Sequence, residues 1–241
     1  KERDMETTAS KQNVFFPETN STGEPNTYGI NKTIIIDSLA ALRLKKRNRV
    51  LELGPKEGGH LPLLMEQAPE LKYFGLDSSR ANIEEAQIQN KHFITEKNAL
   101  FSYYDGQNIL YVHNFFDRVL TINTIYFWKE PNAFLEELYR VLKPGGRCVI
   151  TFLAGDEVKK TPITALSLAS YTIHEFAQLV SASPFSSMDI QTKNTNTTNN
   201  TGVRPTYEYL VATLKKTVKR KNDKGSNVGT YGIKNERISS G

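Results

Sequence analysis

The sequence predicts a doubly wound α/β domain with a mostly parallel seven-stranded sheet whose last strand is antiparallel. Three observations support this. Strand-like and helix-like segments alternate through the middle of the chain, a glycine-bearing turn follows the first strand, and the last two strand-like segments have no helix between them. Parallel strands need long crossover connections, whereas adjacent strands joined by a turn-rich segment pair antiparallel. A length of 241 residues suits one such domain with short appendages.

Seven short segments have the apolar character of strands that are buried on both faces. They are Arg49–Leu53, Leu71–Leu76, Leu100–Tyr104, Asp117–Ile122, Cys148–Phe152, Met188–Thr192 and Tyr207–Leu214. Helical spacing and capping residues predict helices over 34–42, 60–68, 79–90, 132–142 and 172–180. The run Lys143-Pro144-Gly145-Gly146 is expected to stop the fourth of these helices before the fifth strand.

Composition divides the chain into three parts. Residues 1–28 are a polar leader that is expected to form a lid, residues 29–214 are the folded domain, and residues 215–241 are a basic tail. The tail has eight Lys and Arg residues against Asp223 and Glu236, so its net charge is +6 and that of the rest of the chain is −1. Because the basic charge is confined to a tail rich in Lys, Asn, Gly and Ser, the tail is expected to be solvated and nucleic acid is not the favoured partner.

Several classes of protein are disfavoured by the sequence. No stretch approaches the ~18 consecutive apolar residues of a membrane span. The single cysteine, Cys148, excludes an internal disulfide and a cysteine-cluster metal site, and the histidines have no metal-ligand spacing, so no metal is expected. The first ten residues lack the apolar core of a signal peptide, which gives a cytoplasmic location as the expectation.

The turn after the first strand has the residues of a ligand site. Gly54 allows the backbone to pass close beneath a ligand, and Gly58 or Gly59 allows the next helix to start tightly. Asp77, at the end of the second strand, can accept hydrogen bonds from both hydroxyls of an adenosine ribose. Open α/β sheets bind ligands at this edge. Turn glycines and a helix-capping aspartate are the plainer interpretation, but their combination in this order favours a site.

The charges in this turn discriminate between ligands. A dinucleotide site has the pattern G-x-G-x-x-G, and its second glycine makes room for the pyrophosphate. Here that position is Lys56, and Glu52 precedes Gly54 by two residues, where a carboxylate would repel a pyrophosphate. A carboxylate there suits a ligand with a cationic end and no phosphate, such as S-adenosylmethionine.

Residues 49–152 resemble the class I S-adenosylmethionine-dependent methyltransferases, in particular the methyltransferase-11-like group that includes quinone-biosynthesis methyltransferases. The similarity follows the family's motifs in order. They are Glu52-Leu53-Gly54-Pro55, Asp77, Asp105-Gly106, Phe116-Asp117-Arg118-Val119 and, most specifically, Tyr139-Arg140-Val141-Leu142-Lys143-Pro144-Gly145-Gly146. The chain departs from the family at Lys56, where the family commonly has glycine, and this puts the affinity or orientation of the cofactor in question.

The resemblance implies a set of site residues. Those expected to bind S-adenosylmethionine are Glu52, Gly54, Lys56, Gly58, Asp77, Ser78, Asp105, Gly106 and Asn123. On the acceptor side, Tyr126 and Trp128 follow the fourth strand, whose end faces the transferred methyl group in this family, and Tyr28 of the leader is expected to fold over the same mouth. Phe127 is expected to pack in the core instead. No residue is identified as a catalytic base.

The expected activity is methyl transfer to a small-molecule acceptor by in-line displacement, with S-adenosylhomocysteine as the product. The sulfonium activates the methyl group, so the protein mainly supplies proximity and orientation. The Asn-Pro-Pro-aromatic run of amino-directed nucleic-acid methyltransferases is missing after the fourth strand, which disfavours those acceptors. Two alternatives stay open: a non-catalytic cofactor-binding or scaffold protein of the same fold, and an RNA methyltransferase that uses the basic tail. No oligomeric state is predicted.

Overall fold

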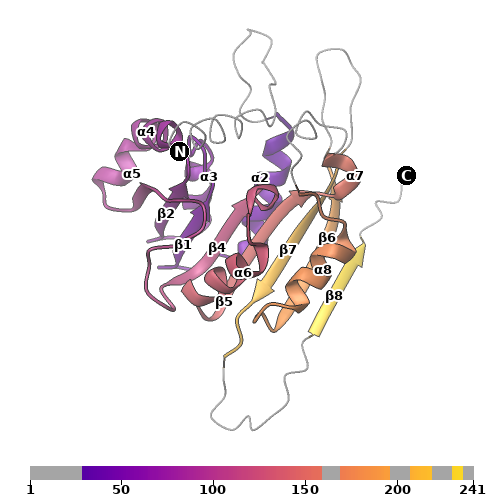
Figure 1. Ribbon diagram of the computed structural model, residues 1–241. Helices are drawn as coiled ribbons and strands as arrows, with labels where there is room; N and C mark the ends of the chain where they lie inside the picture. Colours follow the sequence, from indigo (N-terminus) through magenta and orange to yellow (C-terminus); the bar gives the residue numbers. More distant parts are fainter. Residues whose placement is uncertain (1–28, 159–168, 196–206, 219–229, 236–241) are drawn as a thin grey trace, which may run out of the picture.

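The structure is a computed structural model, and it describes residues 29–158, 169–195, 207–218 and 230–235 (Figure 1). Its described strands form one sheet in the order β3-β2-β1-β4-β5-β7-β6-β8. Strands β1 to β5 pair in parallel with one another, and β7 lies antiparallel between β5 and β6. The predicted α/β fold, with a mostly parallel sheet and an antiparallel seventh strand, is confirmed.

The strands agree with the seven predicted segments to within one or two residues, with the exception of the start of β5. They are β1 (Arg49–Leu53), β2 (Lys72–Asp77), β3 (Ala99–Tyr103), β4 (Phe116–Ile122), β5 (Leu142–Leu153), β6 (Ser187–Asn194), β7 (Glu208–Lys215) and β8 (Thr230–Asn235). The helical elements are α2 (Gly29–Leu42), α3 (Leu61–Met65), α4 (Arg80–Gln89), α5 (Lys91–Thr95), the 3₁₀ turn η2 (Ile125–Phe127), α6 (Pro131–Val141), α7 (Gly155–Val158) and α8 (Ile173–Ser181).

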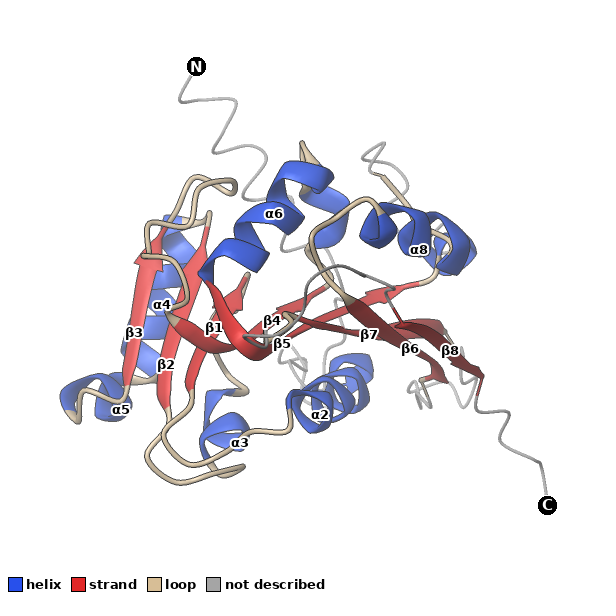
Figure 2. Cartoon of the chain, turned by 90° about the horizontal axis from the view of Figure 1, so that it is seen from below, coloured by secondary structure: helices blue, strands red, loops and turns tan. Residues whose placement is uncertain are grey.

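Helices cover both faces of the sheet (Figure 2). Helix α2 packs on β4, β5 and β7 from one side, whereas α6 and α8 lie on the other side of the same part of the sheet. Helix α4 packs on β2 and β3. Among the interior strands, β7 is buried at every position between its two ends. No helix within the described ranges is long and apolar enough to cross a membrane.

The boundary between α6 and β5 differs from the prediction. Strand β5 begins at Leu142, directly after the helix, and the run expected to be a separate turn lies inside the strand as a bulge. The register with β4 shifts there, because Phe116 pairs with Leu142 but Arg118 pairs with Arg147. Gly145 has a φ of +79°, which glycine adopts without steric cost, so this glycine permits the bulge.

An eighth strand extends the sheet beyond the seven that were expected. Strand β8 pairs in parallel with β6 over six residue pairs, from Ser187–Thr230 to Thr192–Asn235. These six residues lie within segment 215–241, which the sequence predicted to be a solvated tail. Their pairing with β6 therefore shows that this part of the segment belongs to the sheet.

The motif segment on β4 anchors neighbouring elements. Arg118 donates from Nε to the carbonyl oxygen of Leu42 at 2.7 Å, and so satisfies an acceptor that the C-terminal end of α2 leaves without an intrahelical donor. Asp117 accepts from the backbone N–H of Arg49 at 2.8 Å and from Lys143 Nζ at 2.8 Å. These contacts join α2, β1 and β5 to β4, so this part of the family resemblance reflects structure.

Candidate functional site

The candidate site begins where β1 enters its glycine turn. Gly54 has a φ of +70°, and its N–H donates to the carbonyl oxygen of Leu76 at 2.8 Å. A Cβ atom at this position would lie 2.6 Å from Cγ2 of Thr124, far inside van der Waals contact. Glycine is therefore required here by both the backbone conformation and the close approach of the β4–α6 connection.

Lys56, where the sequence departs from the glycine of the motif that it resembles, adopts a backbone conformation that favours glycine. Its φ is +53°, in the left-handed region that a side chain disfavours. Its backbone N–H donates to Oδ2 of Asp77 at 3.1 Å, which ties the turn to the end of β2. Burial lowers the pKa of the Lys56 ammonium group, against the opposing charges of Glu57 and Asp77. The cation therefore lies close to the carboxylate that was expected to bind ribose.

Asp77 is 1% exposed and is the centre of a hydrogen-bond network. Besides the bond from Lys56, its Oδ1 accepts from the backbone N–H of Ser79 at 2.9 Å and from Nδ2 of Asn82 at 3.3 Å. Burial raises the pKa of this carboxyl group, although the three hydrogen bonds oppose the shift. Ser79 caps α4 with its own side chain, which accepts from Asn82 N–H, so Asp77 is not needed as the helix cap.

Glu52 lies beneath the turn in a buried network that the sequence did not predict. His60 Nε2 contacts both carboxylate oxygens, at 2.8 Å and 2.9 Å, and the Tyr73 hydroxyl donates to Oε2 at 2.8 Å. Burial by itself lowers the pKa of His60, but the charge of Glu52 and the hydrogen bond to it outweigh burial and raise that pKa. The network joins β1, β2 and the start of α3.

The second glycine of the turn is fixed by a residue that the sequence analysis missed. Gly58 has a φ of +66°, and a Cβ atom there would lie 2.9 Å from Nδ2 of Asn90. That Nδ2 donates to the carbonyl oxygen of Gly58 at 3.3 Å from the C-terminal end of α4. Asn90 is 32 residues away along the chain, so no local pattern could have associated it with the turn.

Asp105 and Gly106, which were expected to border the adenine side of the site, follow the end of β3. Asp105 is exposed, and its Oδ1 accepts from the N–H groups of Gln107 and Asn108 at 2.8 Å and 2.7 Å, which stabilises the loop. Space is open beside Gly106, where a Cβ atom would meet nothing within 4 Å. Tyr104 was not predicted as a site residue. Burial raises the pKa of its hydroxyl, and the charges of Asp77 and Asp105 add to the shift.

The residues expected on the acceptor side pack inward. Tyr126 is 2% exposed, and its hydroxyl accepts from the N–H of Leu153 at 2.6 Å. Trp128 is buried against the ring of Phe134 and donates from Nε1 to Thr124 Oγ1 at 3.2 Å. Phe127, expected in the core, is half-buried instead. The expected directions of Tyr126 and Phe127 are therefore reversed, because the 3₁₀ turn η2 sets the direction of their side chains.

Two further expected site residues, Ser78 and Asn123, lie at the same edge of the sheet as Asp77. Ser78 is half-buried beside Asp77. Asn123 has a φ of +56°, and its N–H donates to the carbonyl oxygen of Thr151 at 2.8 Å, so it begins the connection that covers Gly54. Tyr28 lies outside the described residues. The structure thus brings the turn, Asp77 and the start of the β4–α6 connection together at the carboxyl ends of β1, β2 and β4.

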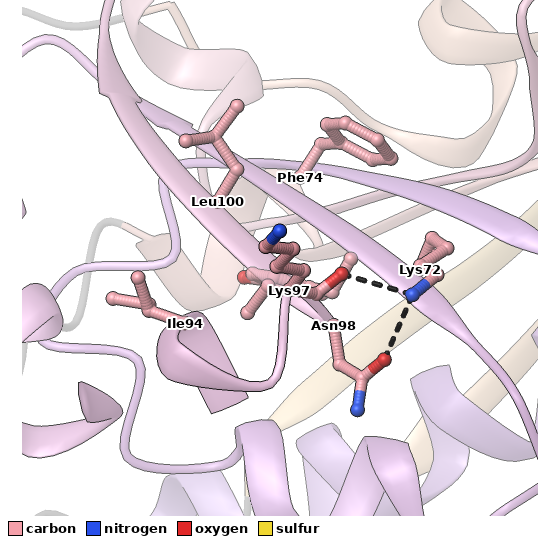
Figure 3. A pocket seen from close by; sticks show the side chains of 8 residues that line it. Lys72, Phe74, Ile94, Lys97, Asn98 and Leu100 are labelled. Carbon is pink, nitrogen blue, oxygen red and sulfur yellow. Dashed lines mark hydrogen bonds between the residues drawn. The ribbon is translucent and has the colours of Figure 1, made fainter. Parts of the chain in front are cut away.

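A separate cavity of about 260 Å³ lies at the opposite edge of the sheet (Figure 3). It is lined by residues at the starts of β2 and β3, and Lys72 Nζ donates there to the carbonyl oxygen of Lys97 and to Oδ1 of Asn98, each at 2.9 Å. Ligands of open α/β sheets bind at the carboxyl ends of strands. This cavity is therefore not part of the candidate site.

Known proteins with similar sequences are methyltransferases. A family model described as "Methyltransferase domain" matches residues 51–150. An uncharacterized methyltransferase, YdaC of Bacillus subtilis (strain 168), is 24% identical over 68% of this chain and 86% of its own length. Phthiotriol/phenolphthiotriol dimycocerosates methyltransferase 1 of Mycobacterium ulcerans (strain Agy99) is 32% identical over 44% of this chain, but over 37% of its own length.

Solved structures show the same fold. A Haemonchus contortus protein described as Phospholethanolamine N-methyltransferase 2, in complex with phosphomonomethylethanolamine and S-adenosylhomocysteine, superposes with a TM-score of 0.60. The match covers 76% of this chain and 53% of that protein, at 15% sequence identity. At this identity the likeness concerns the fold alone.

Proposed function

Residues 51–150 of this chain are a class I S-adenosylmethionine-dependent methyltransferase domain, and we propose that the protein methylates a small-molecule acceptor. The observation that carries the proposal is the buried Asp77 at the end of β2, linked to a glycine turn that also has the buried carboxylate of Glu52. Two buried carboxylates suit a ligand with ribose hydroxyls and a cationic end, and they disfavour a pyrophosphate.

The described residues fit S-adenosylmethionine in chemical type. Asp77 already accepts three hydrogen bonds and could accept one more, from a ribose hydroxyl, with Ser78 beside it. Asp105 and Gly106 border the open space on the adenine side. Glu52 has three hydrogen-bond contacts, and a carboxylate offers about four lone-pair positions, so it can accept from one further donor such as an ammonium group. Between Asp77 and Glu52, the wall of the site would be formed by the backbone of Gly54, Lys56, Gly58 and Asn123.

The chain's own contribution to the reaction is positioning. When bound, S-adenosylmethionine supplies a methyl group that its sulfonium has already activated. The turn residues hold one reactant in a fixed orientation, and correct placement of two reactants removes much of the entropic part of a barrier. We propose that residues near Trp128 and Tyr126 shape the wall of the acceptor site through the packing of the β4–α6 connection.

Calorimetry with S-adenosylhomocysteine tests the cofactor assignment. We expect binding, and a melting temperature that rises with ligand concentration, since the ligand binds the native state. A folded protein that gives no heat at millimolar ligand would refute the assignment. Transfer of labelled methyl groups from S-adenosylmethionine into a small-molecule extract then separates an enzyme from a non-catalytic binding protein, which would bind the ligand and transfer nothing.

RNA is the second candidate acceptor, because the segment 215–241 has a net charge of +6. Binding through that segment would weaken steeply with salt, as each phosphate contact releases condensed counterions. Fluorescence anisotropy with a labelled RNA between 50 and 200 mM salt, on the full chain and on a chain that ends at Val218, decides this. Equal and weak binding by both chains removes RNA as an acceptor.

A further inference from the structure

The Glu52 network contains a histidine to which neither the comparisons nor the proposed function assigns a role. His60 follows the glycine turn and is the N-cap residue of α3, yet its side chain is 11% exposed and points back beneath the turn to Glu52. Because a carboxylate can only accept, His60 Nε2 is the donor in both contacts, at 2.8 Å and 2.9 Å.

We propose that His60 is a positioning residue for the amino-acid end of S-adenosylmethionine: it holds the carboxylate of Glu52 in the orientation that attracts the ligand's ammonium group. The inference deepens the proposed function and rests on it. Tyr73 holds the same carboxylate from β2, at 2.8 Å. With a donor on each side, Glu52 can change its rotamer only by leaving a buried hydrogen bond unmade, which is costly.

The network also compensates for the burial of Glu52. A carboxylate that is 1% exposed has lost most of its hydration, so protein donors must replace the lost hydrogen bonds with water. His60 and Tyr73 are those donors. Without His60, the carboxylate would have one donor fewer and could turn away from the ligand. A purely structural His60 would instead affect all parts of the ligand site alike.

The charge on His60 gives the proposal a second readout. The charges of Glu52 and Glu57 favour the protonated form of His60. On β2, the titratable groups near the network are Tyr73 and Asp77. When Nδ1 loses its proton, the Nε2–H donor remains, but the positive charge that offset Glu52 disappears. The attraction for an ammonium group therefore increases as the pH rises through the pKa of His60.

Two ligands distinguish the contribution of the amino-acid end to binding from that of the adenosine end. S-adenosylhomocysteine has the ammonium group, whereas 5′-methylthioadenosine shares the nucleoside but has no amino-acid portion. By calorimetry at pH 7.5, we expect His60→Leu to weaken the binding of S-adenosylhomocysteine roughly tenfold or more, because a hydrogen bond to a charged group is lost. The affinity for 5′-methylthioadenosine should change by less than about twofold, as expected of a distant site.

Conservative variants distinguish orientation from charge. His60→Gln keeps a donor but cannot titrate, so it should bind S-adenosylhomocysteine with nearly wild-type affinity at pH 7.5. The network raises the pKa of His60 above its ordinary value of 6.5, so as the pH rises from 6.5 the ratio of the two ligands' affinities should rise in the wild type and stay flat in His60→Gln. Tyr73→Phe should reduce the same ratio, and His92→Gln, an exposed histidine on α5, is the matched control and should leave it unchanged.

The outcomes are distinct. Equal weakening of both ligands by His60→Leu, or the same pH slope in His60→Gln and the wild type, overturns the positioning role while the cofactor assignment stands. If His60→Leu does not fold, the pH comparison with His60→Gln still decides. A wild-type protein that binds neither ligand refutes the proposed function and the positioning role together.

Discussion

At the scale of single residues, Lys56 is one of the described non-glycine residues with a positive φ, and it lies within the candidate site. It has a φ of +53° within the turn, where its N–H donates to Asp77. A non-glycine residue held in a sparsely populated conformation costs of order 1–3 kcal/mol, and such residues often cluster at functional sites. The turn tolerates the cost here because the bond to Asp77 fixes the peptide.

We expect Lys56→Gly to relieve this strain without loss of stability, since the left-handed penalty of about 1–2 kcal/mol offsets the entropy that glycine adds to the unfolded chain. It should also tighten the binding of S-adenosylhomocysteine, because the half-buried side chain leaves the turn. Lys97→Gly is the matched control: Lys97 has a φ of +57° but lies in an exposed turn before β3. Both variants should be at least as stable as the wild type, and only Lys56→Gly should alter the calorimetric affinity.

Asp77→Asn should weaken S-adenosylhomocysteine by roughly 1.5–3 kcal/mol, the range for hydrogen bonds to a charged group. An amide has one acceptor oxygen, whereas Asp77 accepts on both of its oxygens, so the variant also loses a partner for Lys56 or Ser79. Titration calorimetry on protein with native circular dichroism measures the effect. Unchanged affinity would reduce Asp77 to a structural role in the turn.

The raised pKa of Asp77 gives a prediction for stability against pH. A carboxyl group whose pKa is higher in the folded state than its ordinary value of 3.8 contributes stability below that value, and the contribution is lost as the pH rises through the folded pKa. The free energy of unfolding of Asp77→Asn, relative to the wild type, should therefore increase from about pH 4 to about pH 7. Urea unfolding across this range tests it, and a difference of opposite slope would mean that hydrogen bonds outweigh burial.

At the scale of elements, polar contacts hold helix α2 against strands β5, β6 and β7. On α2, Ser38 donates to Thr151 Oγ1 at 2.8 Å, and Asp37 pairs with Lys193 of β6 at 3.0 Å and accepts from the Tyr209 hydroxyl. These contacts are buried or half-buried, so they fix α2 against three strands.

Tyr126 makes the corresponding contact from η2. Tyr126→Phe should lower the free energy of unfolding by about 1–3 kcal/mol, because the buried N–H of Leu153 loses its acceptor. Tyr126→Ala should cost about 3–5 kcal/mol through the cavity that it leaves. The affinity of the phenylalanine variant for S-adenosylhomocysteine should stay within about twofold. The half-buried Tyr139→Phe serves as control in urea unfolding, and a collapse of ligand binding in Tyr126→Phe would place this residue in the cofactor site.

At the scale of the whole molecule, the cofactor site and the added strand lie at different ends of the sheet. Four strands, β4, β5, β7 and β6, separate β1 from β8 (Figure 1). Lys216 belongs to the body of the domain, since its Nζ donates to Asn114 Oδ1 at 2.8 Å and to the Tyr139 carbonyl oxygen at 2.7 Å. A truncation that removes β8 can therefore spare the rest of the sheet.

A chain that ends at Val218 should melt below the full chain, because β6 loses its pairing with β8 and becomes an edge strand. It should bind S-adenosylhomocysteine with the same affinity, since the turn and Asp77 lie at the far side of the sheet. Differential scanning fluorimetry and calorimetry on both chains test this. An unchanged melting temperature would show that β8 adds nothing to stability, and lost ligand binding would show long-range coupling to β1.

The amino-acid sequence by itself determined the order and type of most elements, though not of α5, η2, α7 and β8, and it singled out Gly54, Gly58 and Asp77. These are local properties: a strand reveals itself by its apolar run, and a tight turn by its glycines. It also placed the ends of β1, β2 and β4 at one edge, because parallel connectivity leaves no other arrangement. For this reason most of the fold, and the turn within the site, were predictable.

Only the tertiary structure decided what surrounds each of these residues. Glu52 meets His60 and Tyr73 because the turn folds back over β1 and because Glu52 lies opposite Gly75 in the register with β2, two residues from Tyr73. The inward direction of Tyr126 depends on a 3₁₀ turn, and the pairing of β8 depends on a free edge of β6. Such contacts join residues far apart in the chain, and no local pattern encodes which side chain will fill the space beside a buried charge.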